Sequence, residues 1–314
     1  MRTIKPARSK VSAAFTLLEL FVVVLMLAFG LLLLIPTFAH TRPNVQSARC
    51  LNNMRQLMTA MTMYTHESAD FFPPNPDQVF STPGYNWVGG GQNGWVPDLS
   101  AGGNPDAGNP DFLTKTSTDL LSPYIRGNAS LFRCPFEPRV CPYSGSDTNK
   151  LGTIVPVVRS VSMNGGVGTK GSTLSPSSPN SAVDGPWLNG SHSHIANTPY
   201  ATFGKMTDFK NIRPADIWVL ADEDPWSIND AVLAVVANSP DAIDYCSALH
   251  GNATSFAFAD DHAEIHKWKS DIWIHNSMPS RAVFQSKASS GQGYEDWFWW
   301  ASHATRSVVS GTVP

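Results

Sequence analysis

The chain has 314 residues and carries 22 Lys and Arg against 25 Asp and Glu, a formal net charge of −3. This near balance argues against a nucleic-acid binder that works through a strongly basic surface, and four cysteines are too few for a disulfide-built scaffold. Ten Trp and sixteen Phe supply large side chains for a packed core, which excludes global disorder. The length fits one large domain or two small ones.

The N-terminal segment concentrates apolar residues behind a basic leader. Residues 1–14 carry four basic residues and no acid, and an unbroken apolar run follows from Leu20 to Ile35. The 25 residues from Phe15 to Ala39 would make a helix of about 37 Å, long enough to span a hydrocarbon core of about 30 Å with some tilt. The basic flank predicts that residues 1–14 stay cytoplasmic and that the following chain faces outward.

Three interpretations of this segment compete: a cleaved signal peptide, a plain signal anchor, and a segment that assembles with copies of itself. As a signal peptide it is long, and Thr37-Phe38-Ala39 is a poor cleavage site. Neither of the first two explains Glu19, because a carboxylate in an apolar span costs about 2.5–3.5 kcal/mol at the helix centre and less near the interface. A charge that costly needs a partner.

The hexapeptide Phe15-Thr16-Leu17-Leu18-Glu19-Leu20 resembles the N-terminal signal of type IV pilins and type II secretion pseudopilins. In that family a prepilin peptidase cuts before the Phe and methylates the new amine. The Glu is the fifth mature residue, and a Pro often stands at the twenty-second. Counted from Phe15, Glu19 is the fifth residue and Pro36 the twenty-second. The resemblance implies cleavage between Ala14 and Phe15, with Ala14 standing where the family usually has Gly.

The resemblance also implies how such subunits meet. Cleavage exposes the ammonium of Phe15 in or beside the bilayer, where Glu19 of a neighbouring subunit neutralises it and sets the axial register. Phe15, Glu19 and Pro36 are therefore the expected assembly residues. The expected partners are prepilin peptidase, like subunits and the inner membrane, with no nucleic acid. Loss of the four basic leader residues changes the net charge from −3 to −7.

The predicted organisation has four parts. They are a cytoplasmic leader (1–14), a transmembrane assembly helix (15–39), an amphipathic helix (40–70) and an extracytoplasmic domain (71–314) that is periplasmic or displayed on a fibre. Apolar residues recur at three- and four-residue spacing over 44–67, which predicts a helix that packs on the domain's own sheet. The expected fold class is α+β and pilin-like: a long N-terminal helix on an antiparallel sheet, with long Gly- and Pro-rich loops.

Residues 250–268 predict a β-hairpin. With Asp260-Asp261 as a two-residue loop, Phe256 lies opposite Ile265 and Phe258 opposite Ala263. This stretch resembles the H-x9-D-G domain that accompanies the prepilin N-terminus in a large bacterial family. The motif residues are His250, Asp260 and Asp261, and Asp261 stands where the family has Gly.

Two further sites are predicted in the outer domain. Cys134 and Cys141 span eight residues, and we expect a disulfide between them in an oxidising compartment. Cys50 and Cys246 are expected to be small buried residues or free thiols. Five neighbouring residues offer oxygen ligands that suit calcium, as in related pseudopilins, or form a solvated acidic turn: Asp222, Glu223, Asp224, Asn229 and Asp230. No other cofactor is predicted.

The preferred function is structural, with no reaction catalysed. The alternative is a membrane-anchored carbohydrate-binding module that uses exposed aromatic residues: Trp87, Trp95, Trp187, Trp226 and the Trp297–Trp300 tail. A lesser alternative is a metal-dependent hydrolase with ligands from His250, Asp260, His262 and His266. On a strand, His262 and His266 would lie about 13 Å apart, too far to share an ion.

Overall fold

The computed structural model describes most of the chain and divides it into two compact units, residues 1–46 and 47–314. The described residues are 16–75, 86–89, 105–170, 181–225, 227–228, 230–271 and 290–310, without the side chains of 30–44 and 211. Several predicted site residues lie outside this part: Ala14, Phe15, Trp95, Trp226 and Asn229.

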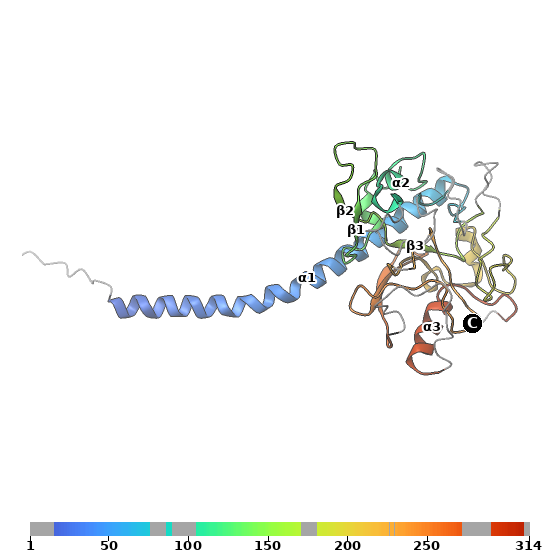
Figure 1. Cartoon of the computed structure of the whole chain (residues 1–314). Coiled ribbons are helices and arrows are strands. Elements are labelled where there is room, and N and C mark those ends of the chain that lie inside the picture. The colour runs from blue at the N-terminus through green and yellow to red at the C-terminus, as the bar shows by residue number, and fades with distance from the viewer. Residues whose placement is uncertain are drawn as a thin grey trace, which may run out of the picture. The chain divides into compact units, whose positions relative to one another are not determined.

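Helix α1 (Leu17–Glu67) is the first element of the described chain (Figure 1). It begins with a reciprocal cap between Thr16 and Glu19. The backbone N–H of Thr16 donates to Oε2 of Glu19 at 2.9 Å, and the N–H of Glu19 donates to the Thr16 hydroxyl at 3.3 Å. This Thr-x-x-Glu arrangement is a capping box, which satisfies backbone donors that a helix start leaves unpaired. Among the described residues, we find no helix that combines the length and the apolar character needed to cross a membrane.

The part of α1 in the second unit has one buried face. Met54, Leu57, Met58 and Met61 are buried at the spacing of an amphipathic helix. They share a core with residues of the sheet, among them Val219. The predicted helix over 44–67 and its packing on the domain's own sheet are therefore confirmed in this unit.

The main sheet has five strands in the order β5-β3-β4-β6-β7. The strands are β3 (Val161–Asn164), β4 (Trp218–Asp222), β5 (Val232–Leu233), β6 (Ala253–Phe258) and β7 (Ala263–Lys267). Neighbouring strands are antiparallel except β3 and β5, which are parallel. The fold class is α+β as predicted, but the sheet is mixed and the predicted purely antiparallel sheet was wrong, because β5 joins β3 in parallel.

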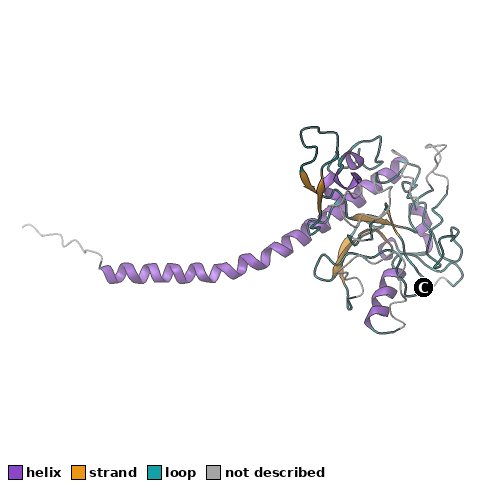
Figure 2. Ribbon diagram, viewed as in Figure 1, coloured by secondary structure: helices purple, strands orange, loops and turns teal. Residues whose placement is uncertain are grey.

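The central strands are buried on both faces. One face shares a core with α1, while Phe256 and Phe258 on β6 pack in a second core with Trp297 and Trp300 of helix α3 (Gln292–Ser302). The sheet therefore lies between two helical layers (Figure 2), which explains why β4 and β6 are apolar runs and do not alternate with exposed residues.

Smaller elements complete the described chain. A second sheet pairs β1 (Val140–Pro142) with β2 (Ile154–Pro156), and α2 spans Asp111–Thr114. Short 3-10 helices are η2 (Pro105–Gly108), η3 (Ala129–Phe132), η4 (Met206–Asn211) and η5 (Pro214–Asp216).

The predicted hairpin is present, but its register was wrong by one residue. Phe256 pairs with Glu264 and Ala257 with Ala263. The N–H of Phe258 donates to the carbonyl of His262 at 2.9 Å, and Asp261 has a φ of 70°. The loop thus has three residues and ends in the left-handed region, the usual alternative to a two-residue turn. The added residue shifts every cross-strand pair.

Candidate metal centre

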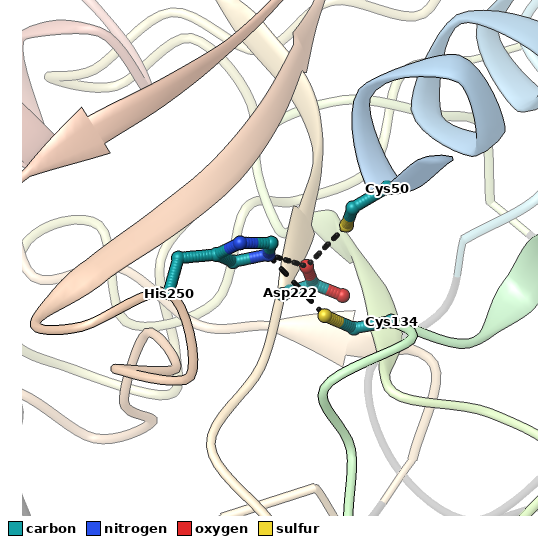
Figure 3. A group of neighbouring side chains, drawn as sticks. All are labelled: Cys50, Cys134, Asp222 and His250. Atoms are coloured by element: carbon teal, nitrogen blue, oxygen red, sulfur yellow. Dashed lines mark hydrogen bonds and ion pairs between the residues drawn. The ribbon is translucent and has the colours of Figure 1, made fainter. Parts of the chain in front are cut away.

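Four side chains of residue types that bind metals meet in the interior of the second unit (Figure 3). Cys50 comes from α1, Cys134 follows η3, Asp222 ends β4, and His250 precedes β6. One ligand atom from each lies within 4.8 Å of the others. Cys50 is 1 % exposed, Cys134 and Asp222 are 0 % exposed, and the His250 side chain is 1 % exposed.

Local backbone structure places each of these residues. The N–H of Cys134 donates to the Ser160 hydroxyl at 2.8 Å, and that hydroxyl donates to Oδ1 of Asp222 at 3.0 Å. His250 sits before a tight turn, where Gly251 and Asn252 have φ values of 71° and 61°. Glycine and asparagine adopt this left-handed region most readily, which favours the turn into β6.

The four side chains contact one another directly. Sγ of Cys50 lies 3.2 Å from Oδ2 of Asp222, and Sγ of Cys134 lies 3.3 Å from Nε2 of His250. Nε2 of His250 is also 3.8 Å from Oδ2 of Asp222. On the other side of the imidazole, Nδ1 lies 3.4 Å from the hydroxyl of Ser47.

The cluster perturbs the acidity of its members in opposite directions. Burial lowers the pKa of His250, but hydrogen bonds to Asp222 and Cys134 outweigh it and raise this pKa to about 9. The hydrogen bond from Cys50 lowers the pKa of Cys134. That same hydrogen bond, burial and the charge of Asp222 raise the pKa of Cys50. A proton is thus most easily removed from Cys134.

Two chemistries use such a set of groups, and the geometry favours one. A Cys–His pair serves as a nucleophile when a third group orients the base through its other nitrogen and the sulfur meets substrate. Here Ser47 lies at the other nitrogen, but Asp222 lies beside the same nitrogen as Cys134, and the cluster is buried, so the sulfur does not meet substrate. Two sulfurs, one imidazole and one carboxylate are instead ligand types of a tetrahedral metal site.

The motif residues occupy the two ends of β6. His250 joins the cluster, whereas Asp260 lies beyond the other end of the strand, where its carboxylate pairs with exposed His262. Oδ1 of Asp261 accepts a hydrogen bond from the Thr62 hydroxyl at 2.7 Å. The hydrolase ligand set does not converge either, since His266 stacks on Trp299 with ring centres 3.5 Å apart.

The predicted calcium set does not form one site in the described part of the chain. Asp222 and Glu223 are consecutive, and their side chains have different partners. Glu223 accepts hydrogen bonds from Ser162 and Ser227, and burial raises its pKa to about 8. Oδ1 of Asp230 accepts instead from the N–H of Val232 at 2.7 Å. Consecutive residues of an extended segment point to opposite faces, which separates the side chain of Asp222 from that of Glu223.

The predicted disulfide is also corrected. All four cysteines are free thiols and all are buried. Cys141 lies on β1, where it pairs in register with Val155 of β2, while Cys134 contacts His250. Proximity in sequence suggested the bridge, but the fold gives the two cysteines different surroundings.

The sequence interpretation missed Cys50 as a member of a site. The four residues are separated by 84, 88 and 28 positions along the chain, so no short spacing pattern marks them. The remaining signal was chemical: a cysteine on the apolar face of an amphipathic helix, and a histidine just before a buried strand. Neither of these two signals identifies a metal site until the fold is known.

A second feature is an aromatic hollow of about 350 Å³ beside α3. Its lining includes Lys269, Tyr294, Phe298 and Trp299. Trp299 is stacked between two imidazoles, with ring centres 3.5 Å from His266 and 4.4 Å from His303. Of the other tryptophans predicted to be exposed, Trp87, Trp297 and Trp300 belong to the buried cores.

Comparisons of the chain with models of protein families, with curated proteins and with solved structures found no match.

Proposed function

We propose that this protein is a structural pilin-like or pseudopilin-like subunit that assembles through its N-terminal helix. The observation that carries the proposal is the hexapeptide from Phe15 to Leu20, with Glu19 at the fifth position and Pro36 at the twenty-second. Cleavage between Ala14 and Phe15 by prepilin peptidase would precede assembly. The subunit would be held in the inner membrane until then.

The exposed surface at the start of α1 supports this proposal. Large apolar side chains from Leu17 to Phe29 are exposed, and Leu17 and Met26 are 86 % and 73 % exposed. A continuous apolar surface of this kind needs a covering. Lipid would supply it before assembly, and the same helices of neighbouring subunits would supply it within a fibre.

Glu19 has two roles under this proposal. In the uncleaved chain its carboxylate caps the helix by accepting from Thr16. After cleavage it would also face the new ammonium group of a neighbouring subunit. The first role needs only an acceptor at this position, whereas the second needs a negative charge, so a substitution can separate them.

The test replaces Glu19 with Gln, because Gln also completes a capping box but carries no charge. We expect Glu19→Gln to abolish fibres in sheared surface material while the protein accumulates in the membrane at the wild-type level. Glu67→Gln, the same change at the other end of α1, is the matched control and should assemble normally. N-terminal sequencing should show Phe15 only in cells that have prepilin peptidase. An intact Met1 with and without the peptidase, or normal fibres of Glu19→Gln, would refute the proposal.

Carbohydrate binding is the second candidate, and the aromatic hollow favours it. Tyr294 and Phe298 are each 37 % exposed and stack with ring centres 6.3 Å apart, so they offer aromatic faces to a sugar ring. Trp299 has both faces covered by imidazoles. Glycan-array binding that is lost in Tyr294→Ala and kept in Tyr143→Ala would support this function. Absence of binding by the full chain would remove it.

A further inference from the structure

We propose that Cys50, Cys134, Asp222 and His250 bind one Zn²⁺ ion as a closed structural site. The ion would hold residues 47–67 of α1 against the central sheet. This inference does not depend on the proposed function, because all four residues lie within the unit of residues 47–314.

The spacing of the donor atoms fits a tetrahedral zinc ion. With Zn–S near 2.3 Å and Zn–N and Zn–O near 2.0–2.1 Å, the ligand atoms of a tetrahedral site lie about 3.4–3.8 Å from one another. Three of the six separations are 3.2 Å between Cys50 and Asp222, 3.3 Å between Cys134 and His250, and 3.8 Å between His250 and Asp222. All six separations are within 4.8 Å, so side-chain shifts of about an ångström or less bring every pair into the tetrahedral range.

The groups around the ligands are arranged as metal sites require. A ligating imidazole presents one nitrogen to the metal and holds the other in a hydrogen bond. His250 presents Nε2 to the cluster, and its Nδ1 lies 3.4 Å from the Ser47 hydroxyl. The Ser47 hydroxyl can accept the proton of Nδ1, which leaves the lone pair of Nε2 to face the ion.

The sulfur and carboxylate ligands are supported in the same way. The N–H of Phe136 donates to Sγ of Cys134 at 3.4 Å, which stabilises a thiolate. The hydroxyls of Ser160 and Ser255 donate to the two oxygens of Asp222. These hydrogen bonds hold the ligands in place.

The choice of zinc follows from the donor set and the protons. Two sulfurs select a soft or borderline ion, and four protein ligands suit the closed tetrahedral sites of zinc. On binding, Cys50 and Cys134 become thiolates and Nε2 of His250 offers its lone pair, so every proton held by the two sulfurs and by Nε2 leaves to solvent as the Zn–S and Zn–N bonds form. No electron is transferred. The site then carries two thiolates, one carboxylate, a neutral imidazole and Zn²⁺, a net charge of −1.

The position of the ligands makes the role structural. The site joins one helix, two loops and one strand that are 28 to 88 residues apart in the chain, and no fifth group is needed to complete it. Because the unfolded chain does not hold these residues together, binding of the ion contributes directly to folding stability. Release of zinc would therefore loosen α1 from the sheet first.

The test measures zinc in the full-length chain, purified in detergent with a tag that contains no histidine. After one equivalent of Zn²⁺ is added and the excess removed, we expect one zinc per chain by elemental analysis. Cys50→Ser and Cys134→Ser should each lose most of this zinc. Cys141→Ser, a change at a buried cysteine outside the cluster, is the matched control and should keep it.

A second measurement covers the case in which a cluster variant fails to fold. Replacement of zinc by Co²⁺ in the wild-type chain should give the visible bands of tetrahedral cobalt and a thiolate charge-transfer band. The thermal midpoint should rise with free Zn²⁺ and fall after chelation. Folded wild-type protein without bound zinc or a cobalt spectrum would overturn the proposal. So would a Cys50–Cys134 disulfide in protein trapped from cells, or unchanged zinc in both serine variants.

Discussion

At the scale of single residues, Asp261 shows how a turn constrains the choice of side chain. Its φ of 70° lies in the region that glycine adopts without cost, and its carboxylate compensates by accepting a hydrogen bond from Thr62 of α1. The motif that this stretch resembles has glycine at this position. Aspartate therefore tolerates the left-handed backbone conformation at this position and also joins the hairpin to α1 through its hydrogen bond with Thr62.

We predict that Asp261→Ala is less stable than Asp261→Gly. Alanine keeps the steric cost of the left-handed region, about 1–2 kcal/mol, and both variants lose the hydrogen bond to Thr62, worth about 0.5–1.5 kcal/mol. Because glycine removes the steric cost of the left-handed conformation, the stability of Asp261→Gly should be near that of wild type. Thermal unfolding of the two variants checks this, and equal midpoints would contradict the assigned backbone strain.

We predict that protonation of His266 makes the folded protein less stable in acid. Burial lowers its pKa to about 4, reinforced by His303 and Lys269 and opposed by Asp296. In the unfolded chain its pKa is near 6.5. Between these values the unfolded chain binds a proton that the folded chain does not, so the stability present above pH 6.5 falls as the pH decreases toward 4.

The variant that tests this is His266→Phe, which keeps an aromatic ring on Trp299 but removes the titration. We expect its thermal midpoint to fall less than that of wild type between pH 7 and 4.5. Some loss should remain, because burial also lowers the pKa of His303. His192→Phe, at an exposed histidine, is the control and should behave as wild type. Parallel midpoint curves for wild type and His266→Phe would exclude the role assigned to His266.

At the scale of elements, α1 changes character along its length. Its first part exposes apolar side chains, whereas the part within the second unit buries one face against the sheet. Helices gain most of their stability from such a packed face and less from intrinsic propensity. The packed face also carries Cys50, which is why the same helix contributes to the candidate metal centre.

We predict that Leu57→Ala destabilises the second unit by about 2–5 kcal/mol, the usual cost of a cavity at a fully buried leucine. Leu57 is 0 % exposed. Met63→Ala, on the same helix but at a residue that is 47 % exposed, should change stability by less than about 1 kcal/mol. Denaturant unfolding in detergent measures both. Similar losses for the two variants would mean that the packed face is misassigned.

At the scale of the whole molecule, Asn164 joins segments that are far apart in sequence. Its side-chain amide on β3 donates to the carbonyls of Trp218 and Ala304 at 2.9 and 3.0 Å, and its Oδ1 accepts from the N–H of Gly166 at 2.8 Å. It is fully buried. A polar side chain satisfied in this way fixes the position of the C-terminal segment on the sheet.

We predict that Asn164→Ala costs about 3 kcal/mol or more, because it leaves buried backbone groups without partners at about 1–3 kcal/mol each. Asn53→Ala removes two longer amide contacts, at 3.3 and 3.4 Å, at the edge of the fold, and should cost less than about 1 kcal/mol. Thermal and denaturant unfolding compare the two. A mild effect of Asn164→Ala would show that water replaces the lost hydrogen bonds.

Much of the local structure followed from the sequence alone. Spacing of three and four residues predicted the helix over 44–67, and paired apolar runs predicted the hairpin after His250. These features depend on contacts between residues close in the chain, so a linear pattern contains them. The N-terminal resemblance likewise lies in one short segment.

Only the tertiary structure decided the partners of the cysteines, the register of the hairpin and the separation of the acidic residues. Cys50 and Cys134 are 84 residues apart and meet because α1 packs on the sheet. Asp222 turns toward them, whereas Glu223 does not. Such encounters depend on long-range packing and on which side of a strand a residue faces, and neighbours in sequence do not specify them.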